Sequence, residues 1–478
     1  MMRASPLPED LLALLPRRSD EGPRVWLVGG AVRDWLLERP ILDLDFAVEG
    51  DALALARSVA DGLQADYYPL DPSRNTGRVL VQDSDTGKRI YDFAGLRGPD
   101  ILTDLRDRDF TINAMAVDPF DLGRLIDPTG GLRDLKEKRL RACSDSAFLS
   151  DPLRVLRAVR LSQMLELRME AETITSLKAA THLIESVSPE RVRDELMRIF
   201  GLAEPSGALR LMLHLNLWEA VFPELPARTD GAAVETALRT LGHAAEILAV
   251  LDPVHDEERA ADAILGSLVW RLGRYRQAIY ENLNAEVAPD RARRPLLFLA
   301  GLFHLVGCSS IGPNGPAMPC PAEARMKLAA QRLRLSRRES RFLLRVLSAM
   351  HELRRIEDIS PLVVYRYFNQ APDAGVGTVL LDLASQLAKQ PGPPSGEDWE
   401  AALAKSRTLL EAAFERREEL IDPPSLVDGT KLISSLGLRP GPEIGRLLER
   451  IREAQVEGLI QTEEQALEWT RRWIQAGR

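Results

Sequence analysis

Two aspartates separated by one residue, Asp43 and Asp45, are the first side chains whose spacing suggests chemistry. They fall in Leu42–Val48, where apolar and polar residues alternate as in a half-buried strand. Side chains two apart in a strand share a face, so the carboxylates converge while Leu44 and Phe46 pack inward. Paired carboxylates repel each other unless a cation lies between them, and Mg²⁺ prefers such oxygen ligands. The pattern predicts a magnesium site, and the alternative is an exposed strand face that water solvates.

A third acid on a neighbouring strand favours the metal. Asp92 lies in Arg89–Phe93, the predicted second strand of a hairpin, with Tyr91 and Phe93 on the opposite face. The competing acids fall in predicted turns: Asp71, Asp83 and Asp85. Two-metal phosphoryl transfer needs acids that hold ions roughly 3.5–4 Å apart, so that one ion activates the attacking oxygen. Asp-x-Asp on one strand beside a third acid on the next is the arrangement that nucleotidyltransferases use.

A pair of glycines could bind the phosphates in such a reaction. Gly29 and Gly30 separate a short apolar strand, Arg24–Val28, from a predicted helix, Ala31–Leu37. Glycines at this junction let backbone N–H groups approach a phosphate at the positive end of the helix dipole. Arg33, in the first turns of the helix, could reach the same anion. The alternative is a turn that merely connects two elements.

Alternating charges precede an apolar stretch between Asp104 and Ala116. Arg108 offers a cation for a phosphate, and Asp109 offers an acceptor for a ribose hydroxyl. The residues from Phe110 onward predict a helix. The alternative is a charged, solvated loop that leads into a core helix.

A second charged helix is predicted further along the chain. Ser150 or Asp151 would cap it, and Pro152 suits its first position. A spacing of three places four charged side chains on neighbouring turns of one face: Asp151, Arg154, Arg157 and Arg160. An aspartate beside an arginine provides both the acceptors and the donors that reading a base edge requires. The alternative is a capped helix with a solvated stripe of arginines.

Two kinds of architecture must position these residues. Strand and helix signals alternate over the first hundred residues, where Ala52–Gln64 predicts a helix and Tyr67–Leu70 and Arg78–Gln82 predict strands. This order is typical of an α/β domain with a mixed sheet. From about Asp145 onward helical patterns dominate. The sequence therefore predicts an α/β head followed by a long all-α part.

Composition excludes several classes of protein. The 478 residues are 45% apolar and 28% charged, which suits a globular protein of several domains. A net charge of −9 and 5% aromatic residues argue against bulk coating of nucleic acid and against a base-stacking platform, but not against a local basic surface. No apolar run is long enough to span a membrane, the start has no signal-peptide pattern, and Cys143, Cys308 and Cys320 share no CxxC spacing. We expect a cytoplasmic protein.

Four motifs occur in the order LVGGAVRD…LDLDF, RDFTINAMA, GLRDLKEKRLR and DPLRVLRAVR. Together they resemble the class II tRNA nucleotidyltransferase and bacterial poly(A) polymerase family, and VDGTKLISSLGLRPGPEIGRLLERIREAQVEG resembles the end of its longer members. The resemblance implies a polymerase-β-like nucleotidyltransferase head at residues 1–145 and a helical neck with a base-reading helix at 146–205. It also implies a helical, degenerate HD-like body at 206–390 and a helical tail, expected to contact tRNA, at 391–478.

The resemblance implies a role for each matching position. Asp43 and Asp45 match the pair that binds Mg²⁺, and Asp92 matches a third carboxylate that acts as base or orienter for the attacking 3′-hydroxyl. The nucleotide-binding positions are Gly29, Gly30 and Arg33 for the triphosphate; Arg108 and Asp109, with Asn113 in the same motif, for the incoming nucleotide and its ribose; Asp151 and Arg154 for the base of CTP or ATP; and Arg157 and Arg160 one and two turns further on.

Three positions depart from the family pattern. Asp107 replaces the first of two arginines before the RDF aspartate, and Ser150 replaces a glutamate. Leu305, in the Leu296–Gly307 segment LLFLAGLFHLVG, replaces the aspartate of the His-Asp pair in an HD-type metal hydrolase. We therefore expect an HD-like region without its metal, which serves as scaffold or RNA contact.

Three basic clusters are candidate tRNA contacts, and a solvated helix face is the alternative for each. They are Arg291, Arg293 and Arg294; Arg332, Arg334, Arg337, Arg338, Arg341 and Arg345; and Arg354 and Arg355.

Together these features predict an enzyme that extends the 3′ end of tRNA with C, A or both from CTP and ATP, and releases pyrophosphate. No membrane and no stable protein partner are implied. The alternatives are a poly(A) polymerase acting on varied RNA, a catalytically silent RNA-binding protein on the same scaffold, and a phosphohydrolase that uses the HD-like region. The intact aspartates argue against the silent protein, and Leu305 argues against the phosphohydrolase.

Overall fold

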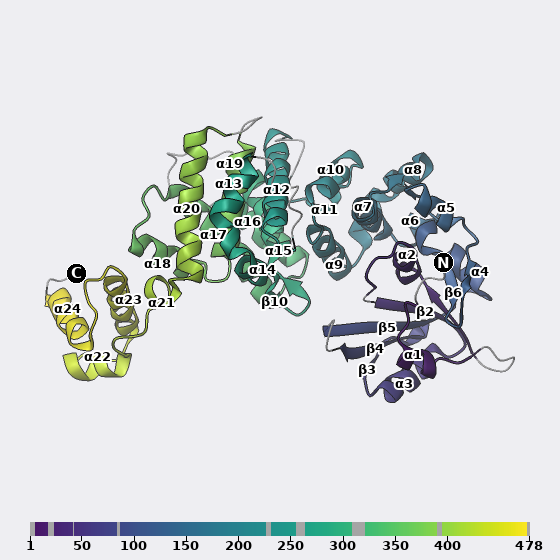
Figure 1. Cartoon of the computed structure of the whole chain (residues 1–478), viewed down its shortest axis with the longest axis horizontal. Coiled ribbons are helices and arrows are strands. Elements are labelled where there is room, and N and C mark those ends of the chain that lie inside the picture. Colours follow the sequence, from purple (N-terminus) through teal and green to yellow (C-terminus); the bar gives the residue numbers. More distant parts are fainter. Residues whose placement is uncertain are drawn as a thin grey trace. The chain divides into compact units, whose positions relative to one another are not determined.

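The computed structural model describes residues 5–17, 23–41, 43–83, 87–225, 231–254, 263–307, 321–389 and 394–475. The chain forms two compact units, Met1–Val187 and Ser188–Arg478 (Figure 1). The first combines strands and helices, and the described residues of the second are helical apart from one short strand pair, β10 (Glu286–Ala288) with β11 (Arg291–Ala292). An α/β head followed by a helical part is confirmed, although the first unit extends to Val187, past the predicted change at about Asp145.

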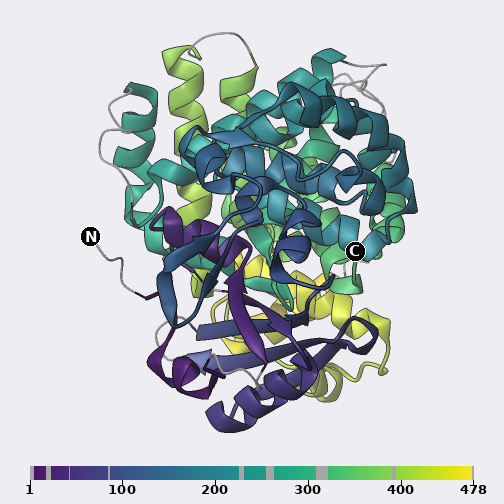
Figure 2. The same ribbon diagram turned by 90° about the vertical axis from the view of Figure 1, so that its right-hand side faces the viewer.

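The first unit is built on a seven-stranded sheet with the order β3-β4-β5-β2-β1-β6-β7, whose strands are purple to blue in Figure 2. Strands β2 and β5 run parallel, and the other described neighbours in this sheet run antiparallel, so the sheet is mixed as predicted. The strands are β1 (Arg24–Val28), β2 (Asp43–Glu49), β3 (Asp66–Asp71), β4 (Thr76–Asp83), β5 (Gly87–Gly95), β6 (Ala116–Asp118) and β7 (Asp121–Ile126), and a separate parallel pair is formed by β8 (Arg139–Leu140) and β9 (Arg168–Met169).

One face of this sheet is apolar. Phe46 and Phe93 pair across β2 and β5, and their rings stack with centroids 4.9 Å apart. Gly77 pairs with Phe93 from β4, and a Cβ on Gly77 would come within 2.9 Å of Ala56 in helix α3 (Ala52–Leu63). Helix α3 therefore covers the apolar face. Because alternate strand residues point to opposite faces, the neighbouring polar residues of β2 and β5 lie on the other face.

The remaining helices of the first unit are short and lie mainly after the strands. They are α1 (Glu9–Leu14), α2 (Gly30–Leu36), α4 (Ile101–Arg106), α5 (Gly131–Lys136), α6 (Ala147–Ser150), α7 (Arg154–Met164) and α8 (Ala171–Ala180). The predicted elements of the first hundred residues are all present, with ends that shift by up to two residues. Leu42, predicted to begin β2, lies outside the described residues.

The predicted helix from Phe110 onward is wrong. The segment forms a 3₁₀ turn, Thr111–Asn113, and then enters strand β6. Every residue from Phe110 to Val117 is buried. A short segment that is buried on all sides need not show the period of its secondary structure, so a strand there cannot be distinguished from a helix by pattern alone.

The second unit is a helical assembly in which α19 is almost wholly buried and packs against α12, α15, α17 and α20. Its helices are α9 (Pro189–Phe200), α10 (Ser206–His214), α11 (Trp218–Val221), α12 (Gly231–Val250), α13 (Ala263–Leu272), α14 (Arg276–Asn284), α15 (Arg293–Gly307), α16 (Pro321–Arg332), α17 (Arg337–Arg355), α18 (Pro361–Gln370), α19 (Gly375–Ala388), α20 (Gly396–Phe414), α21 (Arg417–Leu420), α22 (Gly429–Leu436), α23 (Pro442–Val456) and α24 (Glu463–Gln475).

Helices α22, α23 and α24 share a core of their own around Leu432, Leu447 and Ile451. Polar bonds tie α23 to α18, where the Tyr365 hydroxyl donates to Glu449 over 2.9 Å. None of the described helices is long and apolar enough to cross a membrane. Cys143 is a free cysteine, whereas Cys308 and Cys320 lie outside the described residues.

Candidate active site

A row of charged residues crosses three neighbouring strands on the polar face of the sheet. Asp45 of β2 pairs with Asp92 of β5, and Asp92 pairs with Arg78 of β4. Paired residues on neighbouring strands point to the same face. Asp43 lies two residues before Asp45 and shares that face. The structure thus brings together the three aspartates that the sequence indicated, and adds an arginine.

The electrostatics of Asp45 reflect this crowding of like charges. Asp45 keeps some exposed surface, but protein encloses its carboxyl group. This burial raises the pKa of Asp45 to about 6, and the negative charges of Asp92 and Asp43 act in the same direction, against Arg108 and Arg78. A cation beside this carboxylate would offset both the burial and the repulsion.

Asp92 is already matched to a cation within the protein. Its Oδ1 accepts a hydrogen bond from Arg78 Nε over 2.8 Å, and its Oδ2 accepts one from Arg78 Nη2 over 2.7 Å. Arg78 was not singled out from the sequence. The register of the hairpin could have identified it, because the register that pairs Asp83 with Gly87 also pairs Arg78 with Asp92.

The donor set on β2 suits Mg²⁺. Asp43 and Asp45 offer carboxylate oxygens, the ligands that this ion prefers, from one face of one strand. Within the described ranges, no group of three or more His, Cys, Asp or Glu side chains is placed to hold one ion. The reason at this site is that the guanidinium of Arg78 engages both oxygens of Asp92. The residues therefore fit an ion held by two carboxylates together with ligands from the substrate.

Gly29 makes room between β1 and α2. Its φ of +74° is a conformation that side chains disfavour, and a Cβ there would lie 3.1 Å from Arg108 Nη1 and 3.5 Å from Asp45 Oδ2. Gly30 is the first residue of α2, and a Cβ on it would come within 3.4 Å of Arg33 Nη2. Both glycines keep the backbone close to charged side chains of the site.

Four predicted nucleotide-binding residues form one hydrogen-bonded chain. Arg33 Nη1 donates to Asn113 Oδ1 over 2.7 Å, and Asn113 Nδ2 donates to Asp109 Oδ1 over 3.1 Å. Arg157 Nη1 donates to Asp109 Oδ2 over 2.9 Å. Burial alone would raise the pKa of Asp109, but the charge and hydrogen bond of Arg157, with the bond from Asn113, bring it below its ordinary value. Asp109 is therefore held as an anion.

Arg154 supports the loop that leads into these hydrogen-bonded residues. Its guanidinium donates to the backbone carbonyl of Asp107 over 3.0 Å, to that of Ala147 over 3.2 Å and to that of Arg108 over 3.4 Å. The side chain of Arg108 in turn donates to the buried carboxylate of Asp104 over 3.0 and 3.1 Å. The predicted base-reading arginine is thus buried against the loop between α4 and the 3₁₀ turn.

The prediction that Asp151 shares a helix face with the three arginines is wrong. Helix α7 begins at Arg154, and Asp151 is extended, with its Oδ1 accepting from the backbone N–H of Leu153 over 3.3 Å. Residues 151–153 form a turn with i→i+3 backbone bonds, because the short helix α6 ends at Ser150 just before Pro152. The three arginines do lie along α7 as predicted, at Arg154, Arg157 and Arg160.

The HD-like segment places its histidine inside the helical unit. His304 lies in α15 and is 1% exposed. Burial lowers the pKa of His304 to about 3, and the positive charge of Arg354 acts in the same direction, as does His351. Burial and the two neighbouring basic side chains therefore all favour the neutral form of His304.

At least five of the eleven arginines in the basic clusters pair with other parts of the helical unit. Arg332 forms two bonds to Glu224, of 2.7 and 3.0 Å, and Arg345 pairs with Asp373 over 3.1 Å. Three others are engaged in the same way: Arg291 with Asp194, Arg334 with Glu190, and Arg294 with the carbonyls of Leu202 and Ala203. Exposed arginines remain at the start of α17: Arg337, Arg338 and Arg341. Contact of these clusters with tRNA stays a prediction.

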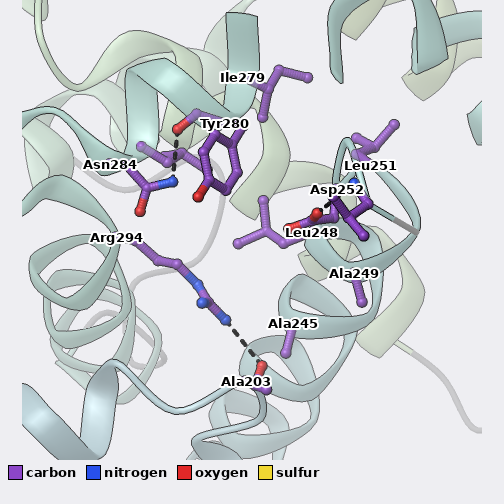
Figure 3. Close-up of a pocket in the computed structure, with 12 residues that line it drawn as sticks. Ala203, Ala245, Leu248, Ala249, Leu251, Asp252, Ile279, Tyr280, Asn284 and Arg294 are labelled. Atoms are coloured by element: carbon purple, nitrogen blue, oxygen red, sulfur yellow. Dashed lines mark hydrogen bonds between the residues drawn. The ribbon is translucent and has the colours of Figure 1, made fainter. Parts of the chain in front are cut away.

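A cavity of about 490 Å³ lies in the second unit between α12 and α14 (Figure 3). Three of its polar side chains are bonded to backbone. Arg294 donates to Ala203, Asn284 donates to the Tyr280 carbonyl over 2.9 Å, and Asp252 accepts from the N–H of Val254 over 2.8 Å.

Comparison with known proteins agrees with this description of the fold. Residues 25–141 match the "Poly A polymerase head domain", residues 166–228 the "Probable RNA and SrmB- binding site of polymerase A", and residues 322–470 domain 2 of tRNA nucleotidyltransferases.

Similar proteins match over nearly the whole chain. A CC-adding tRNA nucleotidyltransferase of Geobacter sulfurreducens is 31% identical, over 97% of this chain and 94% of its own length. An A-adding tRNA nucleotidyltransferase of Deinococcus radiodurans is 30% identical, over 95% and 96%. A solved structure of a CCA-adding enzyme complexed with CTP is 25% identical, with a TM-score of 0.58 and 96% of each chain covered. The chain therefore belongs to the class II tRNA nucleotidyltransferase family and is itself a nucleotidyltransferase.

Proposed function

We propose that this chain adds C, A or both to the 3′ end of tRNA, with CTP and ATP as nucleotide donors. The observation that carries the proposal is the row formed by Asp45, Asp92 and Arg78, with Asp43 beside it, on one face of the head sheet. The full-length similarity to tRNA nucleotidyltransferases supports the choice of substrate.

In the proposed reaction the terminal 3′-hydroxyl attacks the α-phosphorus of the nucleotide. The bond from O3′ to the α-phosphorus forms, the bond to the pyrophosphate oxygen breaks, and the proton of the hydroxyl passes to the Asp92 carboxylate. Asp43 and Asp45 would hold Mg²⁺, which supplies positive charge for the phosphates in the transition state. Arg78 donates to both oxygens of Asp92 and would hold this carboxylate in place beside the attacking hydroxyl.

The remaining residues of the site would bind and select the nucleotide. Arg33 and Arg108 are the proposed phosphate contacts, beside the backbone at Gly29 and Gly30. Asp109, held as an anion, would accept a hydrogen bond from the ribose hydroxyl.

Base selection is assigned to the arginines of α7 and to the turn before it. Asp151 and Arg154 would contact the base, with Arg157 and Arg160 further along the same helix. In this structure Arg154 donates to backbone carbonyls of the preceding loop, so reading a base requires an exchange of these partners. The position of that loop would therefore decide when the base is read.

We also propose that each of four domains has its own role. The protein would work in the cytoplasm. The head at 1–145 would carry the chemistry, and the neck at 146–205 would carry the base-reading helix. The body at 206–390 would act as scaffold, and the tail at 391–478 would contact tRNA. The separate core shared by α22, α23 and α24 supports a distinct tail.

The test uses purified protein, Mg²⁺ and three transcripts of one tRNA: lacking CCA, ending in C and ending in CC. CTP and ATP are supplied singly and together, with an unrelated RNA beside them. Growth to CCA that then stops supports a full CCA-adding enzyme, and growth of only some transcripts supports a CC-adding or A-adding enzyme. Long A tails on either RNA would instead support a poly(A) polymerase, and no incorporation would contradict the proposal.

A further inference from the structure

We propose that Arg78 is a positioning residue that reserves Asp92 for the 3′-hydroxyl of the RNA and keeps this carboxylate out of the metal site. The inference rests on the proposed function and deepens it. It gives a physical reason for the separate roles of Asp92 and of the Asp43–Asp45 pair, and that reason lies in a residue outside the recognised motifs.

The strand register makes such a residue necessary. Asp45 and Asp92 face each other on adjacent parallel strands, whose backbones lie about 5 Å apart. At this spacing both carboxylates can turn toward the same divalent ion, and their mutual repulsion favours that arrangement whenever the ion is bound. Asp92 would then lose the lone pairs that a hydroxyl proton needs. A group on the side of Asp92 that faces away from Asp45 therefore has to hold the Asp92 carboxylate.

Arg78 occupies that other side. It pairs with Asp92 from β4, so Asp92 lies between Arg78 and Asp45 in the row. The two bonds of 2.8 and 2.7 Å come from Nε and Nη2, which is a forked contact to both oxygens. Such a contact fixes the plane of the carboxylate as well as its position. A lysine could supply the charge but not the fork.

The geometry also decides how Arg78 can be distinguished from a structural ion pair. The side chains of Arg78 and Asp92 are 34% and 22% exposed, so their pair is partly open to solvent and is not a deep support of the fold. Removing Arg78 frees a carboxylate next to Asp45 and Asp43. Metal binding should therefore become tighter, whereas loss of a merely structural contact would loosen the site.

The experiment measures Mn²⁺ binding to the nucleotide-free enzyme by the electron paramagnetic resonance signal of the unbound ion. The variants are Arg78→Gln, Arg78→Lys, Asp92→Asn and the double variant Arg78→Gln/Asp92→Asn. Arg74→Gln is the matched control, because Arg74 belongs to the same edge of the sheet and pairs with the exposed Asp71 over 3.6 Å. Circular dichroism confirms that each variant is folded.

We expect Arg78→Gln to bind Mn²⁺ roughly 10-fold more tightly than the unmodified enzyme, because the variant loses a positive charge and releases a carboxylate beside the metal site. The gain should be absent in the double variant and in Arg74→Gln, and smaller in Arg78→Lys. In tRNA extension, Arg78→Gln should lower kcat by roughly 10- to 100-fold, with unchanged KM for CTP and ATP, because only the use of the attacking hydroxyl is impaired.

Unchanged or weaker Mn²⁺ binding by Arg78→Gln would overturn the inference, and so would an equal gain in the double variant. A fall in kcat without the gain in affinity would assign Arg78 a purely structural role. The metal measurement needs no turnover, so it judges Arg78 even if the unmodified enzyme extends no tRNA. That last result would contradict the proposed function separately.

Discussion

The polar face of the head sheet and the surroundings of α15 both enclose titratable groups, with opposite electrostatic consequences. In the head, Asp43, Asp45 and Asp92 gather on one face, and their mutual repulsion helps to raise the pKa of Asp45 to about 6. Around α15, His304 is buried and is influenced by Arg354 and His351. An excess of carboxylates attracts a cation, whereas the positive charge of Arg354 beside His304 opposes one. This contrast favours the head as the place of the proposed metal site.

Arginines show the same contrast between the two regions. In the head, Arg78, Arg108 and Arg157 each contact an aspartate of the site or of its supporting loop. In the helical unit, Arg332 and Arg345 join helices through acids. The arginines of the head contact residues of the candidate site or of its supporting loop, whereas those of the helical unit stabilise the packing of helices. Substitutions can separate these two uses.

The largest effect is expected from Asp43→Asn. The substitution keeps the shape of the side chain but removes one of two carboxylate charges, so incorporation should fall by about three orders of magnitude, or about 4 kcal/mol of transition-state stabilisation. Binding of tRNA, measured by filter retention, should be nearly unchanged. His304→Gln is the matched substitution in the helical unit and should leave incorporation intact. Near-normal activity of Asp43→Asn would remove this aspartate from the mechanism.

A smaller effect is expected from Arg154→Ala, paired with Arg332→Ala. Loss of the Arg154 guanidinium leaves the carbonyls of Asp107 and Ala147 without their donor, so we expect the ratio of kcat/KM for CTP and ATP to change by roughly 10- to 100-fold. Arg332→Ala breaks the pair with Glu224 and should lower the free energy of unfolding by about 1–3 kcal/mol without changing that ratio. An unchanged ratio in Arg154→Ala would contradict its base-reading role.

Gly29→Ala should have a smaller effect again. Its φ of +74° disfavours a side chain, and the new Cβ would crowd Arg108 and Asp45, so the strain costs about 1–3 kcal/mol. We expect incorporation and the thermal midpoint to fall together. Gly30→Ala tests the comparison, because Gly30 is already the first residue of a helix and the nearest atom to its Cβ is a flexible guanidinium. Equal effects of the two substitutions would contradict the argument from conformation.

The sequence predicts the head well where a local pattern decides the structure. Alternation placed Asp43 and Asp45 on one face with Leu44 and Phe46 on the other, and the structure confirms this division. The fully buried segment from Phe110 to Val117 has no such alternation, and its predicted helix is wrong. The predicted helix start at Asp151 is also wrong, because residues 151–153 form a turn between the end of α6 and the first residue of α7, Arg154. Local signals identify elements but not how neighbouring elements share their ends.

Partners across strands and helices are harder to predict than positions along them. Arg78 could have been found only by fixing the hairpin register, and the chain from Arg33 through Asn113 to Asp109 joins residues up to 80 positions apart. The basic clusters show the same difficulty. Composition marks Arg332 as a candidate for RNA contact, but its acid, Glu224, lies 108 residues away in the chain. Tertiary pairing, which composition does not contain, decides whether an arginine remains available.

The smallest effect on activity, and a measurable one on stability, is expected from the pH dependence of the helical unit. The pKa of His304 is about 3 in the folded protein and about 6.5 in an unfolded chain, so between these values the unfolded state binds more protons. Stability contributed by the neutral imidazole is therefore present above pH 6.5 and is lost as the pH falls toward 3. Between pH 7 and pH 5 the loss is about 2 kcal/mol.

His304→Gln removes this titration and serves as the reference. Urea unfolding at pH 7, 6 and 5, followed by circular dichroism, should show a steeper loss of stability in the unmodified protein than in the variant, by about 2 kcal/mol over the range. Parallel pH profiles would mean that His304 is not held neutral by burial. The contrast between the two regions would then fail at α15. An imidazole that becomes protonated in the folded protein would show that the surroundings of His304 accept a positive charge.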